Sequence, residues 1–216
     1  MKPKIKTTLL AAELVTLYIL VPLILFCTGI RSGIFLALWV TGIYAVLVLK
    51  RNPDFTFQKL WHGDGWTVAA KRQAALRFLL IAILLTILTI TYLPEKFLRF
   101  PVENFWLWLL VMALYPVLSA APQELIFRSF FFTRYNDLIG GKLSAILING
   151  LLFGFCHITF NNWIAPICSF FAGVILAHSY QQHRSLKLAV IEHALYGCLV
   201  FTIGIGGYFF TGDWRI

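Results

Sequence analysis

The sequence predicts an all-α fold, a polytopic bundle of about seven transmembrane helices, with an eighth short span as the alternative. Of its 216 residues, 60% are hydrophobic and only 12% are charged, whereas an ordinary soluble domain has about a quarter charged residues. The apolar residues also form runs close to the roughly 20 residues that cross a bilayer as a helix. The length suits a single integral membrane domain covering residues 1–216, without a second sizeable domain.

Seven apolar runs define the expected spans. A polar connection, residues 50–73, separates the second from the third, and the last is long enough for Gly204, Gly206 and Gly207 to break it. We expect spans at residues 9–29, 33–49, 74–93, 105–132, 143–160, 163–179 and 186–210. The first is read as a retained span because no clear small-residue cleavage site follows it.

The net charge of +9 is explained by membrane orientation, since basic residues flank the apolar runs. No nucleic-acid motif is present, so we expect no nucleic acid partner. With the N-terminus in the cytoplasm, the inner segments hold Lys2, Lys4, Lys6, Lys50, Arg51, Lys59, Lys71, Arg72, Arg134, Lys142, Arg184 and Lys187, and the outer segments hold Arg31, Lys96, Arg99 and Arg215. This bias predicts a multi-pass protein with a cytoplasmic N-terminus, which we expect in a plasma membrane of bacterial type.

A few ionisable side chains lie deep inside these runs. A charged group at the bilayer centre costs roughly 2.5–3.5 kcal/mol on the insertion scale, so such groups face the protein interior and usually have partners. The deep candidates are Glu13, Glu124, Arg128, His157, Glu192 and His193.

Glu124 and Arg128 lie four residues apart on the fourth span, so they share a helix face and can pair. Pro116 and Pro122 precede them and can kink or restart the helix. If a new helix begins at Pro122, Glu124 lies in its first turn, where the carboxylate caps free amides. A structural capping role is therefore the alternative to a functional one.

The other deep groups come from the fifth and seventh spans. Phe153, His157 and Asn161 follow one another at four-residue intervals. Glu192 and His193 are adjacent and so point about 100° apart on a helix. Counted from the inner boundary, Glu124 and His193 lie at similar depths of roughly 12 and 10 Å, whereas His157 lies at roughly 21 Å. Each histidine alone fits a hydrogen-bonded core residue.

A carboxylate, a guanidinium and two imidazoles in one wet cavity have an evident chemical use. The carboxylate can take a proton from water, and an imidazole can hydrogen-bond the oxyanion of an attacked carbonyl. This combination predicts hydrolysis of a peptide bond within the membrane by activated water, without a covalent intermediate. We expect neither a cofactor nor a metal.

The ordered motifs resemble those of the CPBP family of intramembrane peptidases, which includes the type II CAAX prenyl endopeptidases. The family pattern EExxxR corresponds to Gln123, Glu124 and Arg128; FxxxH to Phe153 and His157; and HxxxN to His193 and Gly197, in this order along the chain. The resemblance covers about residues 105–210. It implies a glutamate-type endopeptidase that acts on a membrane-embedded or lipidated peptide or protein in the lipid bilayer.

Carried over residue by residue, the resemblance makes Glu124, His157, His193 and Arg128 the catalytic set. In this assignment Glu124 activates water, the histidines hold the water or bind the oxyanion, and Arg128 positions Glu124. The supporting residues are Gln123, Phe153, Asn161 and Glu192.

Two departures from the family pattern matter. Gln123 replaces the first glutamate and cannot act as a base, and Gly197 replaces the asparagine and removes a donor; Asn161 or Glu192 is a candidate to compensate. The departures motivate an alternative, a catalytically degenerate membrane scaffold or chaperone. Metal or haem ligation by the two histidines and transport are weaker readings, since the sequence has neither an HExxH helix nor evident broken half repeats.

Overall fold

The computed structural model describes residues 3–30, 33–51, 55–62 and 65–210, and all regular secondary structure within them is helical. The long helical segments are α1 (Pro3–Val15) continued by η1 (Thr16–Leu20) and α2 (Val21–Thr28), α3 (Gly33–Leu49), α5 (Val68–Tyr92), a composite helix over residues 105–134, α11 (Lys142–Cys156) continued by η5 (His157–Phe160), α12 (Ile164–His183) and α13 (Leu186–Ile203). Short helices connect them: α4 (Phe57–His62), η2 (Pro94–Lys96), α6 (Arg99–Glu103), α10 (Asn136–Ile139) and η6 (Gly206–Phe209).

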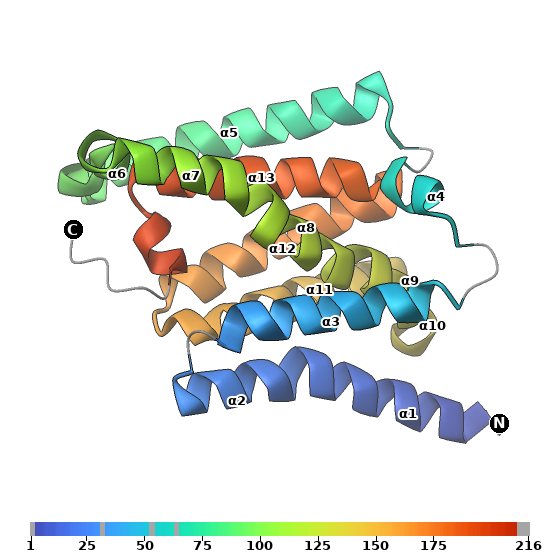
Figure 1. The fold of residues 1–216 in the computed structure, drawn as a ribbon. Coiled ribbons are helices and arrows are strands. Elements are labelled where there is room, and N and C mark those ends of the chain that lie inside the picture. Colours follow the sequence, from blue (N-terminus) through green and yellow to red (C-terminus); the bar gives the residue numbers. More distant parts are fainter. Residues whose placement is uncertain (1–2, 31–32, 52–54, 63–64, 211–216) are drawn as a thin grey trace.

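The helices form one bundle. In Figure 1, α5 lies along one edge, α1 and α2 lie along the opposite edge, and α11, α12 and α13 lie between them. Among the described residues, six helices are long and apolar enough to cross a membrane, and α3 is a shorter apolar helix. The 17 residues of α3 span about 26 Å, close to the thickness of the hydrocarbon core. The predicted polytopic helical fold is thus confirmed.

The ends of several predicted spans differ from the helices, and α1 begins at Pro3 rather than near residue 9. Helix α5 begins at Val68, inside the expected polar connection, because the Thr67 hydroxyl accepts a hydrogen bond from the Ala70 amide and caps the helix. Helix α12 continues to His183, a turn beyond the expected end. Helix α13 stops at Ile203, and Gly204 follows it with φ of 99°, so the break predicted at the glycines is present.

The composite helix contains α7 (Phe105–Tyr115), η3 (Pro116–Ala120), α8 (Ala121–Glu124), η4 (Leu125–Phe130) and α9 (Phe131–Arg134). The restart considered at Pro122 does not occur, because Ala120 and Ala121 both keep helical dihedrals and residues 105–134 run as one 30-residue helix. Two wider π-helical turns, η3 and η4, lie on either side of Pro122 within this helix. Glu124 therefore does not cap a free helix end, and its charge is balanced by side chains.

Helices α11 and α12 approach each other closely through small residues. A Cβ built at Gly150 would lie 2.5 Å from Val174 Cγ2 and 3.1 Å from the Val174 amide nitrogen. Only glycine fits there without moving α12, as in other membrane helix pairs packed through small residues. This contact fixes the face of α11 that carries Asn149, Phe153 and, just beyond its end, His157.

A salt bridge joins α1, in the first span, to the C-terminal end of the composite helix, which forms the fourth span. Arg134 Nη2 lies 2.8 Å from Glu13 Oε2, and the Tyr135 hydroxyl donates to Glu13 Oε1 at 2.8 Å. Burial, followed by the hydrogen bond to the Glu13 carboxylate, raises the pKa of the Tyr135 phenol. Deep Glu13 is thus paired. Three basic residues used for orientation, Lys2, Arg31 and Arg215, lie outside the described residues.

Candidate active site

Glu124 is completely buried near the middle of the composite helix. Arg128 Nε donates to its Oε2 at 2.9 Å and Nη2 donates to Oε1 at 3.4 Å. His193 Nδ1 lies 2.8 Å from Oε1. The pairing expected from the four-residue spacing is present, and both carboxylate oxygens have a partner.

Arg128 is also completely buried and is held from a second helix. Its Nη1 donates to Asn149 Oδ1 on α11, and Asn149 Nδ2 donates to the Phe127 carbonyl at 2.7 Å. The guanidinium carbon lies 5.0 Å from the centre of the Phe153 ring, a distance typical of cation–π contacts. Asn149 and Phe153 therefore fix the cation that holds Glu124.

His193, on α13, links Glu124 to Tyr115. A carboxylate only accepts hydrogen bonds, so Nδ1 carries the proton and donates to Glu124. Nε2 lies 3.0 Å from the Tyr115 hydroxyl. In a neutral ring Nε2 is then the acceptor, and Tyr115 donates to it. Direct hydrogen bonds thus link Tyr115 and Glu124, two residues of the composite helix, through His193 on α13.

His157 is the first residue of η5, and its hydrogen-bond partner is a backbone carbonyl rather than a side chain. Its Nδ1 lies 2.7 Å from the Phe153 carbonyl, which can only accept, so Nδ1 carries the proton and Nε2 is the acceptor of a neutral ring. His157 remains at the far end of its span, as its expected greater depth implied. The Phe153 ring lies between the two histidines: its centre is 4.8 Å from that of His157 and 5.6 Å from that of His193.

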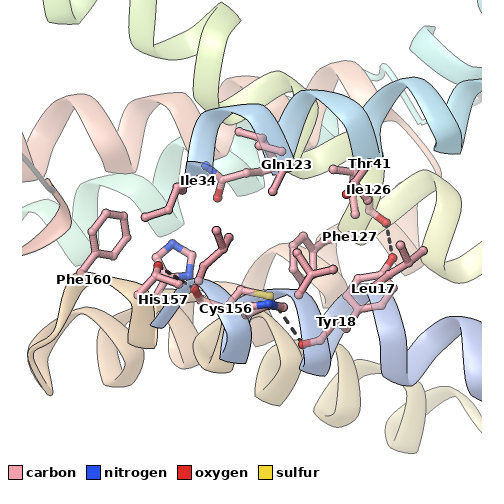
Figure 2. A pocket seen from close by; sticks show the side chains of 16 residues that line it. Leu17, Tyr18, Ile34, Thr41, Gln123, Ile126, Phe127, Cys156, His157 and Phe160 are labelled. Carbon is pink, nitrogen blue, oxygen red and sulfur yellow. Dashed lines mark hydrogen bonds between the residues drawn. The ribbon is translucent and has the colours of Figure 1, made fainter. Parts of the chain in front are cut away.

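The His157 side chain lines a cavity of about 120 Å³. Figure 2 shows His157 and Gln123 on opposite sides of this space, with both side chains directed into it. Thr41 and Thr159 also line the wall, and most other lining groups are apolar. A water molecule here would have polar partners on two sides.

A second cavity of about 260 Å³ adjoins the first along the wall formed by Ile34, Leu38, Gln123 and Phe160. Tyr115 and Ser119 line it, and Gln123 Nε2 donates to the Ser119 hydroxyl at 2.8 Å. Glu124 lines neither cavity, because neighbouring residues of a helix point about 100° apart. Of the adjacent pair, Gln123 faces the cavities and Glu124 faces the buried ion pair.

Two predicted supporting residues lie elsewhere. Glu192 accepts hydrogen bonds from Arg77 at 2.7 and 2.9 Å, from Ser179 at 3.0 Å and from Tyr196 at 2.9 Å. Asn161 is exposed at the end of η5, with φ of 56°. Neither residue reaches the cavities, so neither replaces the donor absent at Gly197.

Sequence reasoning missed several residues of these networks, among them Tyr115, Asn149 and Arg77. Each is a polar group within an apolar run, and this is the signal that could have found them. Arg77 was the clearest, because a lone cation in a span requires an anion, and Glu192 is that anion.

Metal ligation was considered for His157 and His193. In the described parts of the chain, no group of three or more His, Cys, Asp or Glu side chains is placed to hold a metal ion. The partners of the two imidazoles are a backbone carbonyl, a carboxylate and a phenol.

Comparison with known proteins gives one similarity, and it falls on this site. No curated protein and no solved structure matches the chain. The family model described as Type II CAAX prenyl endopeptidase Rce1-like matches residues 103–199, just under half of the chain. This segment contains Glu124, Arg128, His157 and His193. The match confirms the resemblance drawn from the sequence motifs, because residues 103–199 are similar to the Rce1-like type II CAAX prenyl endopeptidases.

Proposed function

We propose that the chain is an intramembrane endopeptidase that hydrolyses a peptide bond of a membrane-embedded or lipidated substrate with activated water. The observation that carries the proposal is the cavity with His157 and Gln123 on its walls, next to the buried Glu124–His193 pair, within the Rce1-like segment. At family level, this segment is CAAX-protease-like.

In the proposed reaction His157 is the general base. Its Nε2 takes a proton from a water molecule in the cavity, and the Gln123 amide orients that water. The water oxygen bonds to the substrate carbonyl carbon, whose π electrons move to the carbonyl oxygen. The imidazolium then gives the proton to the leaving nitrogen as the carbon–nitrogen bond breaks. A positioned acid–base group of this kind contributes about 10²–10⁴-fold to the rate.

Glu124 has a positioning role in this scheme. Its oxygens are occupied by Arg128 and His193 and line neither cavity. The carboxylate fixes the tautomer and orientation of His193, as an acid does in a triad. Direct activation of water by Glu124, the role expected from the motif, stays a prediction that the experiment below separates from this one.

We further propose that residues 1–216 form a single integral membrane domain with a cytoplasmic N-terminus. Six long apolar helices make it a multi-pass membrane protein. The bias of basic residues toward one side supports the orientation. A plasma membrane of bacterial type is the proposed location, and the peptide or its lipid would reach the site from the bilayer.

The test is cleavage of lipidated and membrane-embedded peptides by the reconstituted protein. Glu124→Gln is compared with Glu192→Gln, a matched control, since both carboxylates are completely buried and paired with arginine. We expect Glu124→Gln to lower kcat by about 10²-fold or more and Glu192→Gln to leave it within about threefold in the folded fraction.

His157→Asn separates the two roles of Glu124. If His157 is the base, this change lowers kcat by about 10²–10⁴-fold. If Glu124 takes the proton itself, His157→Asn keeps most of the activity, because the asparagine amide still donates a hydrogen bond, while Glu124→Gln loses it. Equal cleavage by the parent, Glu124→Gln and His157→Asn refutes both versions.

A further inference from the structure

Gly197 lies one turn after His193 on α13, and its missing side chain leaves room for Tyr115. A Cβ built at Gly197 would lie 2.0 Å from Tyr115 Cε1, 2.2 Å from Cζ and 2.4 Å from the hydroxyl oxygen. These separations are far below van der Waals contact. The Tyr115 phenol therefore occupies the space that any side chain at position 197 would enter.

Local structure directs Tyr115 into this space. It is the last residue of α7, immediately before the wide turn that begins at Pro116. Its ring packs edge-on against Phe201, with centroids 5.8 Å apart. Its hydroxyl lies 3.0 Å from His193 Nε2, and the residue lines the larger cavity. Neither Glu124 nor His193 lines that cavity.

We infer that Tyr115 supplies, from α7, the hydrogen-bond donor that position 197 lacks, and that its hydroxyl binds the carbonyl oxygen of the substrate as that oxygen becomes charged. The inference rests on the proposed peptidase function. A phenol has one O–H and two lone pairs. Its O–H donates to His193 Nε2 in the resting site and turns to the substrate oxygen as that oxygen becomes charged. His193 stays neutral, with its proton on Nδ1 and donated to Glu124, and no covalent bond to Tyr115 forms or breaks.

Substitutions at Gly197 and Tyr115 are therefore expected to be coupled, because the two positions share the same space. Gly197→Asn alone drives the new side chain into the phenol ring and is expected to disrupt α7–α13 packing. Tyr115→Ala alone removes both the donor and the ring. Together, Tyr115→Ala and Gly197→Asn place a shorter donor on α13 in the vacated space.

The first arm of the test is cleavage by the full-length protein in vesicles. Tyr115→Phe keeps the ring and loses the hydroxyl, and is expected to lower kcat by about 10²–10³-fold with little change in KM, as removal of an oxyanion donor does. Tyr196→Phe is the matched control, because it removes a buried hydroxyl bound to Glu192, and it is expected to stay within about threefold of the parent. The double variant is expected to exceed Tyr115→Ala by about tenfold or more.

The second arm does not depend on activity. In protein labelled with ¹⁵N-histidine, the Nε2 signal of His193 is expected to shift on Tyr115→Phe and to stay unchanged on Tyr196→Phe. A parent that cleaves no peptide refutes the proposed function, and with it the oxyanion role, even if the shift is seen. A parent that cleaves, together with a Tyr115→Phe variant that is equally active or leaves the His193 signal unmoved, overturns the inference on Tyr115 alone.

Discussion

Asn149→Ala is the substitution that should damage both the fold and the site most clearly. Asn149 is completely buried, accepts a hydrogen bond from Arg128 Nη1 and donates to the Phe127 carbonyl. The change therefore leaves one donor of a buried cation and one buried carbonyl without partners. A hydrogen bond to a charged group is worth about 1.5–3 kcal/mol and a neutral one about 1 kcal/mol, which gives about 2.5–4 kcal/mol in total.

The magnitude can be measured by unfolding in mixed micelles of rising SDS content. At about 1.4 kcal/mol per tenfold, the loss raises the ratio of unfolded to folded protein by about two to three powers of ten. Leu147→Ala is the matched control, because Leu147 lies on the same helix and is 42% exposed. If Asn149→Ala unfolds at the same SDS fraction as Leu147→Ala, the claim that Asn149 holds Arg128 in place is wrong.

Three further predictions address the second ion pair, helix packing and the cavity wall. Breaking the buried pair with Arg77→Met is expected to cost about 3–5 kcal/mol, whereas Arg77→Met with Glu192→Leu costs less because no charge remains unpaired; SDS unfolding of both variants checks the order. Gly150→Ala is expected to destabilise by about 1–3 kcal/mol through overpacking, while Gly207→Ala, where a Cβ meets nothing within 4 Å, has little effect; equal midpoints would contradict the close α11–α12 contact. Gln123→Glu places a carboxylate on both cavities and is expected to raise kcat, by about 10²-fold if it acts as a base. Cleavage by Gln123→Glu with none by the parent would identify the parent as a degenerate enzyme.

The number and class of the helices were predictable because they depend on local properties. A bilayer sets the length of an apolar run, and each backbone amide must find its partner within the same helix. The predicted second span, residues 33–49, coincides with α3. The continuation of the helix through Pro122 was less predictable, because side chains of neighbouring helices contact the wide turns on either side of it. Tyr18, for example, donates to the Ile126 carbonyl within η4 at 2.8 Å.

The site shows the same division between local and tertiary information. Spacing indicated that Glu124 and Arg128 pair, since four residues make one helical turn. Spacing did not indicate which of Gln123 and Glu124 faces the cavities, because that depends on how the composite helix is rotated in the bundle. Adjacent Glu192 and His193 join different networks for the same reason.

The sequence by itself thus determined a helical membrane bundle, the approximate limits of its spans and a short set of ionisable residues that had to lie inside it, because hydrocarbon tolerates neither exposed amides nor unpaired charge. Only the tertiary structure decided the partners. Arg77 meets Glu192, and Tyr115 fills the space above Gly197, across sequence separations that no helical period encodes. Such contacts depend on the rotation and closeness of whole helices, which small residues and side-chain packing set together.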